Sequence, residues 1–472
     1  MNKSSPFFWL PLVILSSFAS VHAVASSTTL TLNELLEQVD SSNPGLSAAR
    51  EYNKALQNRI APAGLPDDPF IAFGMDEIPY GEQSPQAYRY QISQSLPFPG
   101  KLSTREKIAS LRAEASEQET ATQRRELKVT SIQFFYRSFY NSHAIDLNLQ
   151  LQRVVRSAMQ SAKARYEAGG TEHHDWLLAK MELATLAIEQ EKLKREQVWL
   201  HTSLNELRGY PAETQFQINT MDFPRVPEPI IDVNFNSQPE LATLDAQVEQ
   251  AAAEYKLAKL SYYPDFVVQV MAMEPRAMGE MENEQSNWGV MVGMNVPLYF
   301  GRKQSKLAAA ARHEQQAAAM DKLYLNNKLK TELVNASQSL ASAQDLLRVY
   351  ETDVLPSTQL ALENAQSAYR TRRMALSQYL ALEKIHAIQK LELVAARIDV
   401  ELAKTRLNEL LSSPPLLKLA PSRPTVFGAG NMGDGMSVSD TVNMGGGMST
   451  PNNSAKKSLP TDQGGNSGMG GM

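Results

Sequence analysis

The stretch QAYRYQISQSLPFPGK, residues 86–101, decides the fold, because it alternates apolar and polar side chains in a chain whose other long segments have helical patterns. An extended strand places these two kinds of side chain on opposite faces. The apolar set is Tyr88, Tyr90, Ile92 and Leu96, and the polar set is Arg89, Gln91, Ser93 and Ser95. One face suits lipid and the other suits water, as in membrane-spanning strands.

The same alternation returns in the second half of the chain, over residues 287–296. Residues 70–75 and 266–273 supply a partner strand for each, so we expect four strands in two hairpins. Strands in lipid must close into a barrel, and the smallest such barrels have about 8 strands. Four strands cannot close, so the chain is expected to oligomerise: two copies would give eight strands and three would give twelve.

Four landmarks indicate an internal repeat, because they recur in the same order and with nearly the same spacing. The matched pairs are NPGL 43–46 with QPEL 238–241, Pro69 with Pro264, LPFPGK 96–101 with VPLYFGRK 296–303, and RYEAGG 165–170 with AYRTRR 368–373. Each unit is expected to contain a helix, two strands, a very long helix, a turn and a returning helix.

The long segments predict helical hairpins. Residues 103–166 contain neither Gly nor Pro, which allows one helix about 95 Å long at 1.5 Å per residue. In the second unit, apolar residues from Leu329 to Val354 step by four and three, which is a coiled-coil seam, and Pro356 predicts a kink or a restart. Residues 175–207 and 376–411 are the expected return helices. The predicted fold class is mainly α with a small β part.

The expected organisation has five parts. Residues 1–25 resemble a secretory signal peptide, with a lysine, an apolar core and small residues at the cleavage site. Residues 26–208 are the first repeat, residues 209–237 a Pro-rich equatorial linker, and residues 238–412 the second repeat. Residues 413–472 form a Met/Gly-rich flexible tail.

Composition excludes several function classes. The net charge of −5 gives no basic footprint for nucleic acid, and 7 His with 0 Cys leave little for thiol or zinc chemistry. No enzyme motif appears, so we expect the protein not to be an enzyme. Without Cys no lipid anchor can be attached, and no apolar run beyond residue 30 is long enough for a transmembrane helix. A membrane role must therefore come from strands.

The segments SQSLPFPGK 93–101, ARYEAGG 164–170, VPLYFGRK 296–303 and the region of Tyr369 resemble the TolC-like outer-membrane efflux proteins. SQSLPFPGK looks most like their heavy-metal branch, for copper/silver or cobalt/zinc/cadmium. The resemblance implies a homotrimer in the outer membrane of a Gram-negative bacterium. It would carry a twelve-stranded transmembrane β-barrel on a periplasmic α-helical tunnel, and its partners would be a periplasmic adaptor (membrane fusion) protein, an inner-membrane RND-type pump and outer-membrane lipid.

The resemblance also suggests roles for the turns and the hairpin tips. Strands would meet helices at Pro97, Pro99, Gly100, Pro297 and Gly301, where Pro prevents strand pairing and Gly allows a bend. The tips would form a periplasmic gate or adaptor contact through Gly169, Gly170, Asp175, Tyr369, Arg372 and Arg373. Arg372 stands where the family has Gly, and Met374 where it has its gating Arg. We expect Asp175 to pair with Arg372 or Arg373, unless these charges only solvate a turn.

Methionines suggest the cargo, because thioethers are soft ligands that favour Cu(I) and Ag(I). One group crowds the second hairpin: Met271, Met273, Met278, Met281, Met291 and Met294. The other lies in the tail: Met432, Met436, Met444, Met448, Met469 and Met472. His173 and His174 form a weaker candidate metal site at the first tip. The alternatives are a plain low-complexity tail, an apolar wall and polar tip surface; no resident cofactor is expected, only transient Cu(I)/Ag(I) binding.

These observations favour a passive duct in a tripartite efflux system that exports heavy-metal ions, with copper or silver preferred. Two other functions stay open. The same duct could export organic drugs or a secreted polypeptide, or the chain could be a secreted coiled-coil structural protein with no transport role.

Overall fold

The computed structural model of the chain describes residues 29–76, 87–169, 173–220, 222–228, 238–275 and 285–412. All of them belong to one compact unit, Met1–Val426. Most are helical, and within them no helix is both long enough and apolar enough to cross a membrane.

The first repeat has the expected order of elements. They are α1 (Leu32–Ser42), α2 (Pro44–Asn58), α3 (Ile60–Ala63), β2 (Phe70–Asp76), β3 (Ala87–Leu96), α4 (Lys101–Glu167) and α5 (His173–Arg208). A capping box starts α1: Thr31 Oγ1 accepts from the Glu34 backbone N–H, and the Glu34 carboxylate accepts from the Thr31 backbone N–H. The single long helix predicted over residues 103–166 is confirmed by α4.

The second repeat follows the same plan. Its elements are α6 (Pro239–Leu260), β5 (Asp265–Pro275), β6 (Asn287–Asn295), α7 (Gln304–Val349), the π-helical turn η2 (Tyr350–Val354), α8 (Leu355–Arg370) and α9 (Leu376–Ser412). The restart expected at Pro356 is the π-turn that ends at Val354, because proline cannot donate to the preceding α-helical turn.

A matched pair of side-chain hydrogen bonds shows the repeat at the level of contacts. In the first unit the Asn43 side-chain amide, just before α2, donates to the Leu207 carbonyl near the end of α5 at 2.8 Å. In the second unit the Gln238 amide, just before α6, donates to the Leu410 carbonyl near the end of α9 at 2.5 Å. Each bond satisfies a carbonyl in the last turn of the return helix.

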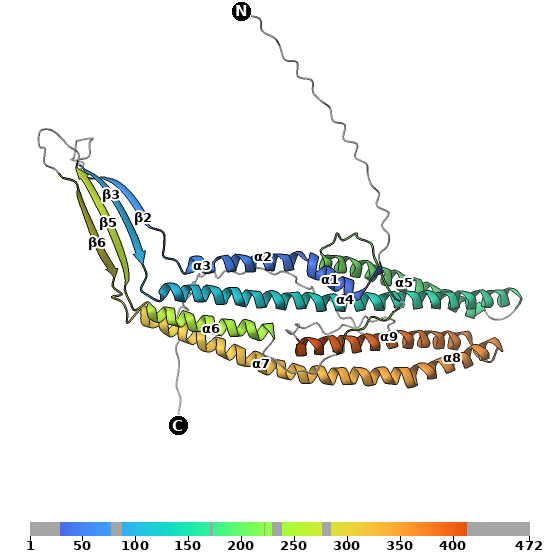
Figure 1. Cartoon of the computed structure of the whole chain (residues 1–472). Helices are drawn as coiled ribbons and strands as arrows, with labels where there is room; N and C mark the ends of the chain where they lie inside the picture. The colour runs from blue at the N-terminus through green and yellow to red at the C-terminus, as the bar shows by residue number, and fades with distance from the viewer. Residues whose placement is uncertain are drawn as a thin grey trace, which may run out of the picture. The chain divides into compact units, whose positions relative to one another are not determined.

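The four long strands form one antiparallel sheet in the order β2-β3-β5-β6 (Figure 1). The two hairpins therefore lie side by side through β3 and β5, although a helical hairpin separates them in the sequence. β2 and β6 are the edges of this sheet. A separate short parallel pair joins β1 (Thr29–Leu30) to β4 (Gln217–Ile218) in the linker.

The helices pack as two hairpins that are joined through α6 and α9, both of which lie against α4. α5 packs against α4, α8 and α7 pack against α9, and α6 lies against both α4 and α7 (Figure 1). The largest fully buried side chains on α4 are Phe135, Tyr136 and Phe139.

The described part of the linker crosses α4 and α9. The Tyr136 hydroxyl donates to the Pro224 carbonyl at 2.9 Å, and the Val226 backbone N–H donates to Glu401 at 2.7 Å. Lys404 of α9 is paired with Glu228 at 2.6 Å. These bonds satisfy a non-helical backbone that would otherwise lie unpaired on the helices.

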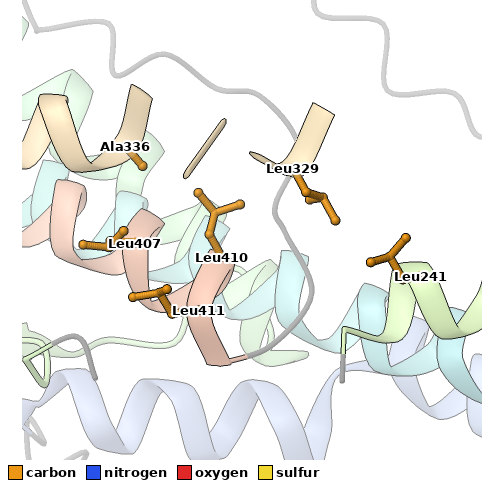
Figure 2. Packing of buried hydrophobic residues seen from close by; sticks show 6 residues of the cluster. All are labelled: Leu241, Leu329, Ala336, Leu407, Leu410 and Leu411. Carbon is orange, nitrogen blue, oxygen red and sulfur yellow. The ribbon is translucent and has the colours of Figure 1, made fainter. Parts of the chain in front are cut away.

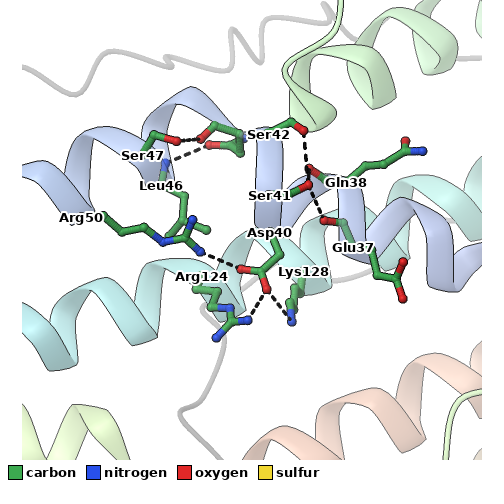
Figure 3. Close-up of polar contacts among 11 residues, drawn as sticks. Glu37, Gln38, Asp40, Ser41, Ser42, Leu46, Ser47, Arg50, Arg124 and Lys128 are labelled. Carbon is green, nitrogen blue, oxygen red and sulfur yellow. Dashed lines mark hydrogen bonds and ion pairs between the residues drawn. The ribbon is translucent and has the colours of Figure 1, made fainter.

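Two clusters hold the helices near the junction of the repeats. The apolar one comes from α6, α7 and α9 and contains Leu241, Leu329, Ala336, Leu407, Leu410 and Leu411 (Figure 2). The polar one centres on Asp40 of α1, which binds Arg50 of α2 at 2.9 Å and also contacts Arg124 and Lys128 of α4 (Figure 3). Burial alone would raise the pKa of Asp40, but the hydrogen bond and charge of Arg124, with the other two cations, hold it below its ordinary value.

Glu240 opens α6 among other carboxylates. Burial raises its pKa to about 7, and the charges of Glu126 on α4 and Glu332 on α7 add to this shift, against the opposite effect of Lys328 and Arg406. The unfolded chain would release this proton near the ordinary value of 4.5. Between those two values folding takes up a proton, so this group makes the chain less stable as the pH rises.

We predict that Glu240→Gln reduces the loss of stability between about pH 5 and about pH 8, by on the order of 1 kcal/mol after allowance for solvent screening. Unfolding followed by circular dichroism at both pH values measures it. Glu249→Gln, an exposed position on the same helix, is the matched control and should behave like the unmodified chain. Equal pH dependence of the two variants would contradict the prediction.

Candidate functional site

The four-stranded sheet has two chemically different faces, set by the register of its strands. One row across the sheet is Phe73, Tyr90, Ala272 and Trp288, and the next is Ile71, Ile92, Val270 and Val290. This face is open: Ile71 is 73% exposed and Trp288 is 78% exposed. An apolar surface of this kind is unusual in water and marks a contact with lipid or protein.

The opposite face, called the polar face below, carries Arg89, Gln91, Ser93, Gln269 and Asn287 together with three methionines and Phe70. Its rows are Gly74, Arg89, Met273 and Asn287, then Ala72, Gln91, Met271 and Gly289, then Phe70, Ser93, Gln269 and Met291. Arg89 pairs with Asp76 at 2.5 Å. The Met residues of the second hairpin therefore divide: three share the polar face, and Met294 lies on the apolar face opposite Phe266. Met278 and Met281 lie outside the described residues.

Among the three polar-face methionines, Met271 and Met291 are diagonal neighbours on adjacent strands. The Met271 side chain lies over Gly289, where a Cβ would come within 3.7 Å of its Cγ. Met273 follows Met271 on the same face of β5, two residues along. Long side chains at diagonal and i+2 positions can reach one another. The three methionines thus follow one another along this face, in rows that also carry Gln91 and Gln269.

The turn from β3 into α4 is held by a partly buried ion pair. Gly100 has φ +93°, a left-handed conformation that favours glycine. The next residue, Lys101, binds Asp265 at the start of β5 at 2.7 Å and the Tyr263 carbonyl at 3.0 Å. The Phe98 ring stacks on Tyr263 with centroids 4.5 Å apart. Pro97 and Pro99 flank this ring in the sequence.

The matching turn from β6 into α7 differs in its backbone and its environment. Pro297 ends β6 pairing as Pro97 ends β3 pairing, but Gly301 has no positive φ and no neighbour that a Cβ would meet. The side chains between them are open: Leu298 is 76% exposed and Tyr299 is 74% exposed. The bend that we expected from Gly301 therefore does not depend on glycine in this protomer.

At the hairpin tips, the contact between the repeats runs through Arg165 and Tyr369. The Arg165 guanidinium at the end of α4 donates to the Tyr369 hydroxyl and lies 5.3 Å from its ring centroid. Tyr369 in turn stacks on Tyr379 of α9, with centroids 5.0 Å apart. The expected residue Tyr369 is thus in the tip contact, whereas Arg165 was not expected, because its spacing alone gives no sign of a partner in the other repeat.

The other tip residues are separate from this contact. Asp175 is half-buried in the first turn of α5, and within the part of the protomer that the structure describes it forms no ion pair with Arg372 or Arg373, which are exposed. His174 is exposed, and His173 packs between Tyr166 and Trp176 at 4.7 and 5.6 Å. Gly170 lies outside the described residues, as do the six tail methionines.

No protein-family model matches the sequence, and no curated protein matches it. Solved structures match the fold. The Campylobacter jejuni CmeC outer membrane channel has a TM-score of 0.72 and 11% identity, over 86% of this chain and 94% of that one. CusC, described for its transmembrane channel formation, gives 0.70 and 12%, over 82% and 93%. The open Neisseria gonorrhoeae MtrE outer membrane channel gives 0.65 and 13%, over 87% and 98%. This chain has the TolC-like channel fold.

The two tip turns have equivalent conformations with different residues. Gly169 has φ +87° and follows α4, and Arg372 has φ +60° and follows α8. The Arg373 backbone N–H donates to the Ala368 carbonyl at 2.8 Å, which closes the turn as a Schellman motif with Arg372 in the left-handed position. A non-glycine residue is strained there by about 1–2 kcal/mol.

We predict that Arg372→Gly stabilises the second tip and that Arg372→Val destabilises it, each by about 1 kcal/mol. Glycine adopts φ +60° without steric cost, whereas a β-branched residue is more strained there than arginine. Amide hydrogen exchange at residues 367–377 measures this local opening. Arg373→Gly, next to it but without a positive φ, is the control. If Arg373→Gly changed the exchange protection as much as Arg372→Gly does, the effect would come from the lost charge and the prediction would be wrong.

Proposed function

We propose that the protein is the outer-membrane channel of a tripartite efflux system, a passive duct assembled from three copies. The observation that carries this proposal is the sheet with an exposed apolar face, a polar opposite face and two open edges, each hairpin of which continues into a helical hairpin. Three copies would supply twelve strands for a transmembrane β-barrel, with the apolar rows toward lipid and the polar rows toward the lumen. The helical hairpins would extend the wall as a periplasmic tunnel.

The tips of the helical hairpins are the proposed periplasmic entrance. Arg165, Tyr369 and Tyr379 link the two hairpins of one protomer, which would hold the tips together in a closed state. Asp175 and the exposed cations Arg372 and Arg373 are proposed to act between protomers or toward a periplasmic adaptor. Exposed ion pairs contribute only about 0–1 kcal/mol each, so closure would need several of them. The driving force would come from an inner-membrane RND-type pump.

Soft metal ions, Cu(I) or Ag(I), are the cargo that we propose. The support comes from Met271, Met273 and Met291, which share the polar face of the sheet with Gln91 and Gln269. Thioethers bind these ions through soft donors and release them easily when the sites are few and neutral. The tail methionines, with two similar NMGxGMS segments, would offer further ligands of the same kind. His173 and His174 would contact ions only in transit.

We predict that a strain lacking this protein grows less well on graded copper and silver, with several-fold lower tolerance, and that the plasmid-borne chain restores growth. Zinc and organic toxicants are tested in the same way, and sensitivity to one of them in place of copper and silver would identify a different cargo. Sensitivity to organic toxicants alone would be consistent with the proposed channel but would contradict the proposed metal cargo. If the purified chain adds no conductance to a planar lipid bilayer, the proposed channel function is contradicted and a secreted coiled-coil protein is favoured.

A variant with Met271→Leu, Met273→Leu and Met291→Leu tests the polar-face methionines directly. Leucine keeps the volume and removes the thioethers, so we predict several-fold lower tolerance to copper and silver with unchanged channel conductance. Met75→Leu with Met294→Leu is the matched control, because both side chains lie on the apolar face. Equal tolerance of the two variants would show that the polar-face methionines have a structural role in the sheet and no role in metal transport.

A further inference from the structure

The turn from β6 into α7 combines exposed apolar side chains with exposed cations. Four apolar residues around its proline are each more than half exposed: Val296, Leu298, Tyr299 and Phe300. Three exposed cations follow them around the start of α7: Arg302, Lys303 and Lys306. Bulky apolar side chains next to cations suit the boundary between lipid and water. We call residues 296–306 the cationic turn.

The cationic turn has no carboxylate nearby in the sequence to balance its charge. Residues 296–312 contain four cations and neither Asp nor Glu. Among the described residues, the first salt bridge of α7 is formed further along the helix, by Lys322 with Asp245. The N-terminal end of a helix is itself positive, and α7 carries no acidic residue in its first turn. The turn therefore presents a positive surface that an anion from outside the protomer can neutralise.

The turn from β3 into α4 differs, because its groups find partners inside the protomer. Lys101, directly after its glycine, has a side chain only 8% exposed and binds Asp265. The Phe98 ring is half-buried against Tyr263. The cationic turn has one residue more between its proline and its glycine, and this length brings two aromatic residues into succession. Uncompensated charge beside exposed aromatic rings is thus a property of the second turn.

The cationic turn lies where the apolar face of the sheet ends. Val296 follows Met294 by two residues, so it lies on the side of the apolar face. The pairing of β6 ends at Asn295, opposite Asp265. In the proposed channel this level is the boundary between the lipid and the helical tunnel, where aromatic side chains are favoured. The cations of the turn therefore lie at the level of lipid headgroups.

We infer that the cationic turn binds the phosphate of an anionic phospholipid in the membrane leaflet nearest the helices. This rests on the proposed channel and adds a lipid partner to it, with one site on each copy of the chain. Tyr299 and Phe300 lie against the acyl chains. Arg302, Lys303 and Lys306 surround the phosphate, which an arginine can bind through two N–H groups at once. A zwitterionic headgroup carries its own cation, so it neutralises the turn less well than an anionic one.

Native mass spectrometry of the full-length protein, purified as a trimer in a neutral detergent, tests this inference. The probes are phosphatidylglycerol, which is anionic, and phosphatidylcholine, which is zwitterionic, with the same acyl chains. We predict that the trimer binds phosphatidylglycerol about tenfold more tightly, and that salt weakens this preference. A variant with Arg302→Gln, Lys303→Gln and Lys306→Gln should bind the two lipids equally, because it keeps the apolar side chains and loses the charges.

Two further variants separate the charge of the turn from its apolar part. Arg153→Gln, Arg156→Gln and Lys330→Gln remove three exposed cations from α4 and α7 away from the turn. This matched control has the same net charge as the first variant and should keep the preference for phosphatidylglycerol. Tyr299→Ser with Phe300→Ser should weaken the binding of both lipids by a similar factor, because it removes apolar area and leaves the cations in place.

Several results would overturn the inference while the proposed channel stands. One is equal binding of the two lipids by the unmodified trimer, and another is a control variant that loses the preference as well. Displacement of phosphatidylglycerol by an equal concentration of inorganic phosphate would show a site for the free anion. If the variant without the three cations no longer forms trimers, the turn binds a neighbouring copy of the chain. Unmodified chain that forms neither trimers nor conducting channels would contradict the proposed function itself.

Discussion

The hydrogen-bonding demand of two open strand edges is the constraint on which the rest depends. A sheet of four strands leaves a row of N–H and C=O groups on β2 and another on β6. Water can satisfy such groups, but lipid cannot, and the exposed apolar rows that include Trp288 and Ile71 suit lipid. The two features conflict in a single protomer. In the proposed assembly a neighbouring copy would resolve the conflict, since it would cover the edge and continue the apolar face.

The internal repeat gives the chain similar structural elements at the centre of the sheet and at its edges. The junction that closes β3 against β5 inside the protomer uses Lys101 and Asp265. At the outer edge, Arg302 follows Gly301 as Lys101 follows Gly100, and its backbone N–H donates to the Tyr299 carbonyl as that of Lys101 donates to the Phe98 carbonyl. The internal repeat therefore brings a similar turn to the internal contact of the sheet and to its outer edge at β6. The differences between copies, such as the positive φ of Gly100 and its absence at Gly301, fall where one joint is complete and the other is open.

The sequence was enough to predict elements whose signal is local. The lack of Gly and Pro over residues 103–166 predicted α4, the alternation of residues 87–96 predicted β3, and Pro356 predicted the interruption now seen as η2. Contacts between distant segments could not be predicted in this way. The bond from Arg165 to Tyr369 and the Asp40 cluster join residues with no shared period, so only the folded chain reveals them. Arg372 is an intermediate case. The sequence showed that it stands where related proteins have glycine, but only the structure shows its positive φ.

The division of the methionines follows from the same geometry. A strand residue changes face with every step, so the sequence cluster in the second hairpin had to separate once the register was fixed. Met271, Met273 and Met291 fall with Gln91 and Gln269, and Met294 falls with the apolar rows. If soft cations are the cargo, as proposed, a cation passing along that face would meet several weak neutral ligands in succession.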